Sequence, residues 1–323
     1  MSRTTRLVFF LIGATIVALM VWKAGPDTLW AALRSSAWVV AALIPLWATV
    51  YLLNALAWRM LTSKGGSAIP LPRALLMTVI AFAINYSTPL LSFGGEPLKV
   101  VAATRALGRP RAVGSIVAFR LLHAVAHVLC FLLALVPAAL LLPHSAVTYG
   151  VILAVGAALL LITVFLFSRH SEGLALHALH LLRRLPLLKR LAVRLEPRTA
   201  MLHEIDSHVT SIYKSAPRRF YAALSVEMVA RLLSLAEYWV ILYGLGLGVD
   251  PWRAFVVASF SSLVVNALIF IPFELGTKEG GVYLMFEWLG IAPGLGLAAA
   301  LLSRVRELIW IAIGWALIWT VED

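Results

Sequence analysis

The sequence predicts an all-α, polytopic membrane protein. Hydrophobic residues make up 62% of the 323 residues and charged residues only 13%, whereas a soluble domain is about half apolar and a quarter charged. The apolar residues fall in long, nearly uncharged runs, which is typical of helices that cross a bilayer. The formal charge of +12 then indicates cytoplasmic loops that face anionic headgroups, and no nucleic-acid-binding motif is present. A single cysteine, Cys130, excludes an intrachain disulfide.

About six runs are expected to be full spans, within a single transmembrane domain over residues 1–323. The first follows Arg3 and Arg6 and resembles a signal peptide, but no convincing small-residue cleavage site follows, so we expect it to be retained. A short interfacial helix is expected at 28–36, where Trp30 suits the headgroup level. The expected full spans are 7–22, 37–58, 112–142, 146–168, 220–245 and 297–320.

Residues 169–219 form the largest polar segment. They hold ten Lys and Arg against four Asp and Glu, and their leucines recur at helical spacing. We interpret this segment as a basic, cytoplasmic, amphipathic connector on the membrane surface. A regulatory or lipid-sensing role is the alternative.

Two apolar stretches are broken by helix-disrupting and charged residues. Residues 85–99 read NYSTPLLSFGGEPLK, and residues 272–281 read PFELGTKEGG. Such segments are tolerated at membrane depth only where protein or a water-filled cavity surrounds them. We therefore expect the two to face each other inside the membrane and to form the working site. The breaks are assigned to Pro89, Gly94, Gly95, Pro272, Gly276, Gly280 and Gly281.

The two halves of the chain share a pattern that indicates an internal repeat. In each broken segment a glutamate follows a proline by seven positions; Glu96 then precedes Arg120 by 24 residues, and Glu279 precedes Arg304 by 25. Matches in the same order predict a duplicated unit covering about 45–142 and 225–320.

The distribution of positive charge predicts that the repeats are inverted. The N-terminus and the basic loop 105–111 are expected on the cytoplasmic side, and the loops 143–150 and 290–296, which lack Lys and Arg, on the outer side. Segment 74–104 would then be a re-entrant hairpin from the cytoplasmic face and 254–290 one from the outer face. One alternative stays open: residues 71–90 are long enough to span fully, and the inversion would then fail.

Charged residues in apolar sequence are interpreted either as buried salt bridges or as a binding site. Glu227 and Arg231, four residues apart, and Arg304 and Glu307, three apart, are spaced to pair along their own helices. Arg120 and Arg304 are also suited to bidentate phosphate recognition. The expected substrate-binding residues are Glu96, Lys99, Arg120, Lys278, Glu279 and Arg304.

No catalytic residue, cofactor or metal is expected. His123 and His127 share a helix face, but no third ligand is evident. A phosphate-cradling loop, a nucleophile elbow and a dinucleotide fingerprint are all lacking.

Over about residues 7–320 the chain resembles the lysylphosphatidylglycerol synthase transmembrane-region family. The resemblance is carried by the stretches SFGGEPLKVVAATRALG, AFRLL, IPFELGTKEGG and LLSRVRELIW. The chain departs from the family pattern at Phe273 and Glu274, where glycines are common. The resemblance implies a flippase-like domain without the soluble aminoacyl-transferring domain, with Glu96, Arg120, Glu279 and Arg304 in its cavity.

The expected function is movement of an amphiphilic, phosphate-bearing lipid such as a phospholipid between leaflets of the inner (plasma) membrane. Two alternatives stay open. One is a membrane-embedded enzyme that acts on a lipid-linked substrate with Glu96 or Glu279 as general base; the other is a non-transporting scaffold of a lipid-synthesis complex. Expected partners are membrane lipids and, in the scaffold alternative, lipid-biosynthesis enzymes, with no nucleic acid.

Overall fold

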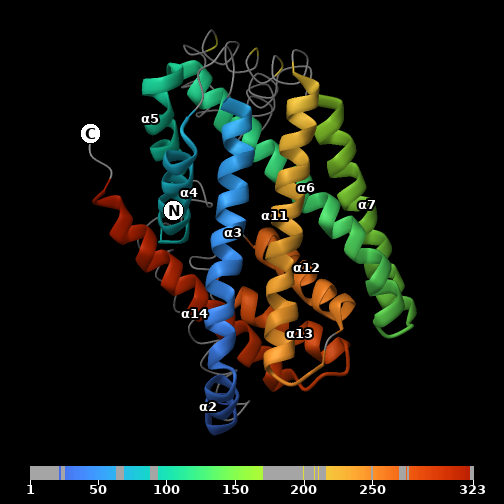
Figure 1. Ribbon diagram of the computed structural model, residues 1–323. Helices are drawn as coiled ribbons and strands as arrows, with labels where there is room; N and C mark the ends of the chain where they lie inside the picture. The colour runs from blue at the N-terminus through green and yellow to red at the C-terminus, as the bar shows by residue number, and fades with distance from the viewer. Residues whose placement is uncertain are drawn as a thin grey trace, which may run out of the picture.

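The computed structural model is a bundle of helices, and no strand occurs in the part of the chain that it describes (Figure 1). This confirms the all-α class. The expected first span and nearly all of the connector at 169–219 lie outside the described residues, as do Pro89 and Pro272. The structure describes residues 26–62, 69–87, 94–169, 216–248, 250–268 and 276–320, together with Trp22, Thr199, Ser207, Thr210 and Glu274.

Two long antiparallel helices form the centre of the bundle. Helix α3 (Ala37–Thr62) rises from the short helix α2 (Pro26–Ser35) at the lower end of Figure 1, and α11 (Pro217–Gly244) runs the opposite way beside it. The 26 residues of α3 extend for about 39 Å at 1.5 Å per residue. Its length and apolar character suit a full span, as the sequence predicted for 37–58.

Helix α6 (Arg109–Leu141) crosses the bundle obliquely, and α7 (Ala146–Arg169) stands at the side (Figure 1). Gly108 precedes α6 with a left-handed φ of 75°, a conformation that glycine adopts without steric cost. A short turn at Pro143 joins the two helices, and α7 packs chiefly on α6. Helix α7 therefore leaves most of its apolar surface facing outward.

Two helical hairpins occupy opposite ends of the bundle. The first consists of α4 (Leu71–Ser87) and α5 (Glu96–Leu107), and the second of α12 (Pro251–Ala267) and α13 (Thr277–Trp288). Each has a 17-residue arm followed by a 12-residue arm. In Figure 1 the outer ends of the first hairpin lie at the upper end of the bundle and those of the second at the lower end.

The last helix, α14 (Pro293–Ile318), completes a reciprocal packing pattern. Helix α14 packs on α4 as α6 packs on α12, and α5 packs on α6 as α13 packs on α14. Likewise, α3 contacts α4 as α11 contacts α12.

The burial pattern is that of a membrane protein. Leu140, Leu153 and Leu161 are at least 70% exposed, whereas Glu237, Arg306 and Glu307 are at most 4% exposed. Charged side chains are thus inside and apolar ones outside, the reverse of the usual soluble arrangement. Three described helices are long and apolar enough to cross a membrane: Ala37–Thr62, Arg109–Leu141 and Ala146–Val164.

Candidate functional site

A cavity of about 800 Å³ lies within the bundle. It separates two apolar cores, one toward each end of the bundle. Side chains from both hairpins and from α3, α6, α7, α11 and α14 line it. Four of the six residues predicted to bind substrate are among them: Glu96, Lys99, Arg120 and Lys278. Glu279 and Arg304 are not part of this lining.

The first hairpin presents Glu96 to the cavity from the first turn of α5. A carboxylate is favourable there because the helix dipole places partial positive charge at the N-terminus. The Oε1 atom pairs with Arg120 of α6, whereas the buried Oε2 atom has no hydrogen-bond partner. The helix start is tied to α4, because the amide of Gly95 donates to Asn85 Oδ1 over 2.6 Å. A side chain at Gly95 would clash, since a Cβ would lie 2.4 Å from the carbonyl oxygen of Ala81.

Lys99, one turn further along α5, is held by aromatic rings. Its Nζ atom lies 5.3 Å from the ring centroid of Trp58 and 5.1 Å from that of Phe119. Both distances are in the range of a cation–π interaction. The side chain is only 4% exposed, so its ammonium is stabilised mainly by these rings and by the nearby charge of Glu96.

Glu227 and Arg231 do not form the pair along α11 that their spacing predicted. Glu227 instead binds His123 Nδ1 of α6 and lies 3.5 Å from Asn54 Nδ2 of α3. The Nη2 atom of Arg231 donates to Ser262 Oγ of α12 over 2.7 Å. The prediction was wrong because partners on neighbouring helices reach these groups, and interhelical contacts are invisible to spacing along one helix.

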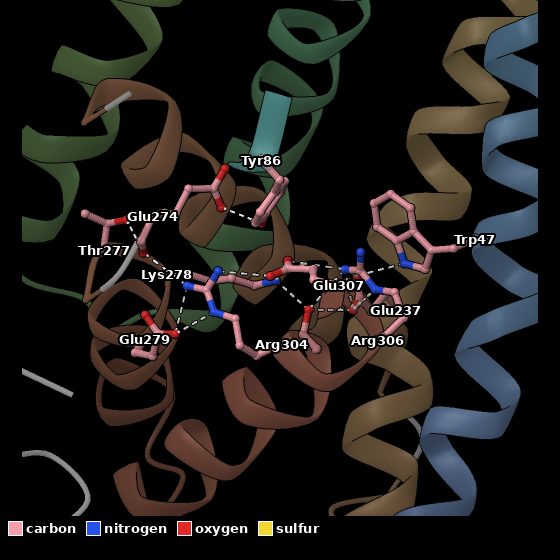
Figure 2. A network of polar contacts seen from close by, with 11 residues as sticks. Trp47, Tyr86, Glu237, Glu274, Thr277, Lys278, Glu279, Arg304, Arg306 and Glu307 are labelled. Atoms are coloured by element: carbon pink, nitrogen blue, oxygen red, sulfur yellow. Dashed lines mark hydrogen bonds and ion pairs between the residues drawn. The ribbon is translucent and has the colours of Figure 1, made fainter. Parts of the chain in front are cut away.

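The second hairpin belongs to a denser network of ion pairs (Figure 2). Glu307 accepts from Lys278 and, over 3.0 Å, from Arg304 Nη1, so the predicted i,i+3 pair on α14 is confirmed. Arg306 Nη2 donates to Glu237 Oε2 over 2.8 Å, and its guanidinium lies 3.8 Å from the ring centroid of Trp47. Three helices, α11, α13 and α14, are thereby joined through largely buried charges.

Glu279 is fully engaged within this network. Its Oε1 atom accepts from Arg304 Nη2 over 2.9 Å, and its Oε2 atom accepts from the amide of Gly276 over 2.9 Å. Gly276 has a left-handed φ of 78° and caps α13, so Glu279 supplies a hydrogen bond to the first orphan amide of its own helix. Both oxygens therefore have structural partners, and the side chain is 1% exposed.

The two broken segments meet at Glu274. Glu274, a position at which the resemblance implies glycine, adopts a left-handed φ of 54°, which is costly for a residue with a side chain. Three hydrogen bonds hold it: Tyr86 Oη of α4 donates to its carboxylate over 2.9 Å, and Thr277 Oγ1 and Arg304 Nη2 donate to its carbonyl. The contact between Tyr86 and Glu274 links the first hairpin to the second, as Figure 2 shows.

Sequence reasoning did not select several of the residues that line the cavity. Glu227 and Arg231 were recognised as charges in an apolar run but not as members of a site. Asn54 gave no signal, because a single polar residue in a helix is common, and Tyr86 lay in the predicted segment 85–99 but was not singled out. Among the described residues no group of three or more His, Cys, Asp or Glu could hold a metal, and His123 and His127 both use Nδ1 in other contacts.

Apolar helices that face outward around a charged cavity define a polytopic membrane protein with a polar interior. The model of the family described as the lysylphosphatidylglycerol synthase TM region matches residues 6–314. The chain belongs to this family, as the resemblance predicted. No curated protein and no solved structure matches the chain.

Proposed function

We propose that the protein moves an amphiphilic, phosphate-bearing lipid between the leaflets of the inner (plasma) membrane. The observation that carries this proposal is the charged cavity enclosed by helices whose outer surfaces are apolar. A lipid headgroup needs polar surroundings to cross a bilayer, whereas its tails can remain in the hydrocarbon. The cavity would receive the headgroup while the tails follow the outer surface of the bundle.

The side wall of the cavity supports access from the bilayer. Leu159 and Ile162 of α7 and Phe131 of α6 contribute apolar surface to its lining. Because α7 packs chiefly on α6, the wall beside α7 is held by fewer helix contacts than the rest of the bundle. We place the entry of the lipid at this wall.

The paired hairpins support an inverted topology. Their arms of 17 and 12 residues extend for about 26 and 18 Å, less than a hydrocarbon core of about 30 Å. Reciprocal packing on α6 and α14 fits repeat units at about 45–142 and 225–320. Together with the basic loops, these features favour a cytoplasmic N-terminus and re-entrant hairpins from opposite faces, a design that recurs in transporters.

The six predicted binding residues would act in two ways. Glu96, Lys99, Arg120 and Lys278 line the cavity and would contact the headgroup, whereas Glu279 and Arg304 would support Lys278 and the turn of α13 from behind. The open Oε2 atom of Glu96 can accept a proton or a donor group of the headgroup. No ATP-binding motif is present in the sequence, so transport would be energy-independent or coupled to protons.

Leaflet exchange in purified proteoliposomes tests the proposal. The exchange of fluorescent phosphatidylglycerol and of a polyprenyl phosphate is measured for wild type, Glu96→Gln and Glu287→Gln. Glu287 is the matched control because it is an exposed carboxylate of α13 outside the cavity. We expect exchange by wild type and by Glu287→Gln, and a loss of about tenfold or more for Glu96→Gln, since the amide cannot take the proton or the full charge–charge contact.

Two results would contradict the proposal. A chemically changed lipid in the purified system would identify an enzyme. Absence of exchange with every lipid, while the protein remains folded, would favour the scaffold alternative, and that alternative also predicts unchanged growth phenotypes for Glu96→Gln and Glu279→Gln.

A further inference from the structure

Arg231 differs from the other arginines of the cavity. Within the described part of the chain, three arginines line the cavity, and two of them have carboxylate partners: Arg120 with Glu96, and Arg306 with Glu237. Among the described residues, no carboxylate lies within ion-pair distance of Arg231. A guanidinium at membrane depth without a counter-ion is costly and marks a functional group.

The hydrogen bonds of Arg231 leave part of its donor capacity unused. Its Nη2 atom donates to Ser262 Oγ over 2.7 Å, and its Nη1 atom lies 3.4 Å from Ser234 Oγ. The Nε atom is buried and has no acceptor. A buried donor without an acceptor costs about 1–3 kcal/mol, so the group is poised for a ligand that supplies one.

Ser262 also has a hydrogen-bond donor without an acceptor. Its hydroxyl oxygen accepts from Arg231 Nη2 and, over 3.3 Å, from Asn266 Nδ2. A hydroxyl has two acceptor positions and one proton, so both acceptor positions are occupied and the O–H remains to donate. The neighbouring Ser261 Oγ is also buried without a partner, and both serines line the cavity.

The guanidinium is positioned by its surroundings. The ring centroid of Phe131 on α6 lies 5.6 Å from the guanidinium carbon, within the range of a cation–π contact. Ser262 on α12 holds one nitrogen of the group and Phe131 contacts its face. Donors from α11 and α12 therefore converge on one part of the cavity wall.

We infer that Arg231 and Ser262 form an oxyanion subsite, and that it takes the phosphate group of an amphiphile. This inference rests on the proposed function and names the part of the cavity that recognises the headgroup. A phosphate offers acceptor oxygens only, and it matches a planar guanidinium bidentately. It would satisfy Arg231 Nε and the Ser262 hydroxyl together and neutralise the cation. A headgroup without acceptor oxygens would leave both donors unpaired.

Ligand binding to the full-length protein in maltoside detergent tests the subsite. Decyl phosphate is titrated against wild type, Arg231→Gln, Arg231→Lys and Arg253→Gln, with binding followed by native mass spectrometry. Arg253 is the control because it lies at the exposed start of α12, paired with Asp250 and outside the cavity. Loss of a charge-assisted hydrogen-bond donor predicts binding weaker by about tenfold or more for Arg231→Gln. Arg231→Lys should retain part of the affinity, and Arg253→Gln should bind as wild type does.

A second arm identifies the source of the oxyanion. If inorganic phosphate does not displace decyl phosphate at equal concentration, the ligand is a lipid phosphate; if it does, the subsite takes a soluble phosphate. Unchanged binding of decyl phosphate by folded Arg231→Gln overturns the inference in either case. Should Arg231→Gln not fold, Ser262→Ala decides the matter: severalfold weaker binding supports the subsite, and unchanged binding rejects it.

The outcomes separate this inference from the proposed function. Binding that depends on Arg231 without any leaflet exchange would keep the subsite and reject the flippase. Leaflet exchange together with binding that ignores Arg231 would keep the flippase and reject the subsite.

Discussion

Glu96 of the first hairpin and Glu279 of the second stand at equivalent places, each in the first turn of a 12-residue arm and each paired with an arginine of the next helix. Their surroundings differ. Glu279 uses both oxygens, one for Arg304 and one for the amide of Gly276. Glu96 uses one oxygen, and its other oxygen is buried without a partner. The two glutamates therefore differ in their hydrogen bonding: Glu279 has partners for both oxygens, and Glu96 has a partner for only one.

The next helix repeats this contrast. Three residues after Arg304, Glu307 binds Lys278, Arg304 and Arg306. Three residues after Arg120, the chain has His123, whose ring reaches across to Glu227. Glu279 and Glu307 have partners for both carboxylate oxygens, whereas Glu96 and Glu227 each keep one buried oxygen without a partner. We take α13 and α14 as the fixed wall of the cavity, and α5, α11 and α12 as its ligand-facing part.

The contrast between the two hairpins depends first on topology, and it would fail if both hairpins entered the membrane from the same face. Single cysteines are introduced at exposed positions, Arg109→Cys and Ala292→Cys, in a Cys130→Ser background. Because the two positions lie at the starts of α6 and α14, at opposite ends of the bundle (Figure 1), we expect a membrane-impermeant maleimide to label them from opposite sides. Labelling of both from the same side would show that the hairpins are not inverted.

The largest energetic effect is expected at Glu307. Replacing it by glutamine removes the counter-charge of Lys278 and weakens that of Arg304, and breaking a buried ion pair costs about 3–5 kcal/mol. The matched change His123→Gln should cost less than about 1 kcal/mol, because the amide can still donate to Glu227. Unfolding in detergent, followed by thermal or denaturant titration, measures both. Equal losses of stability would mean that the two networks are equally structural.

A smaller difference is expected between Glu279→Gln and Glu96→Gln. Both oxygens of Glu279 accept hydrogen bonds, so an amide there must set its NH₂ group against a donor, at a cost of about 1–3 kcal/mol. Glu96 has one oxygen in use, and an amide can keep that contact and place its NH₂ group at the open position. Its free energy of unfolding should therefore fall by less than about 1 kcal/mol. If Glu96→Gln destabilises the protein as much as Glu279→Gln does, the lost exchange expected for it would reflect folding.

Much of the fold could be predicted from the sequence because its signals are local. Apolar runs located α3, α6 and α7, and proline and glycine located the ends of the short arms. The pair Arg304 and Glu307 was also predictable, since its partners lie on one helix face. For α4, however, the helix starts at Leu71, three residues before the expected 74, because Pro72 is tolerated in the first turn of a helix.

The partners of the cavity charges could not be predicted in the same way. Spacing assigned Glu227 to Arg231, whereas the structure assigns Glu227 to His123 and Arg231 to Ser262. Ser262, Asn54 and Tyr86 are ordinary polar residues in the sequence, and they matter only because other helices bring charges to them.

The sequence by itself determined that this protein is helical and membrane-embedded, where its broken segments lie, and which residues carry charge into the membrane. Those properties follow from the transfer free energies and backbone preferences of individual residues, which act within a few positions along the chain. Only the tertiary structure decided that Glu279 is enclosed while Glu96 keeps an open oxygen, and that Arg231 is left without a carboxylate. Which buried charges are paired depends on atoms that are a few ångströms apart in space but can be more than 100 residues apart in sequence, such as those of His123 and Glu227.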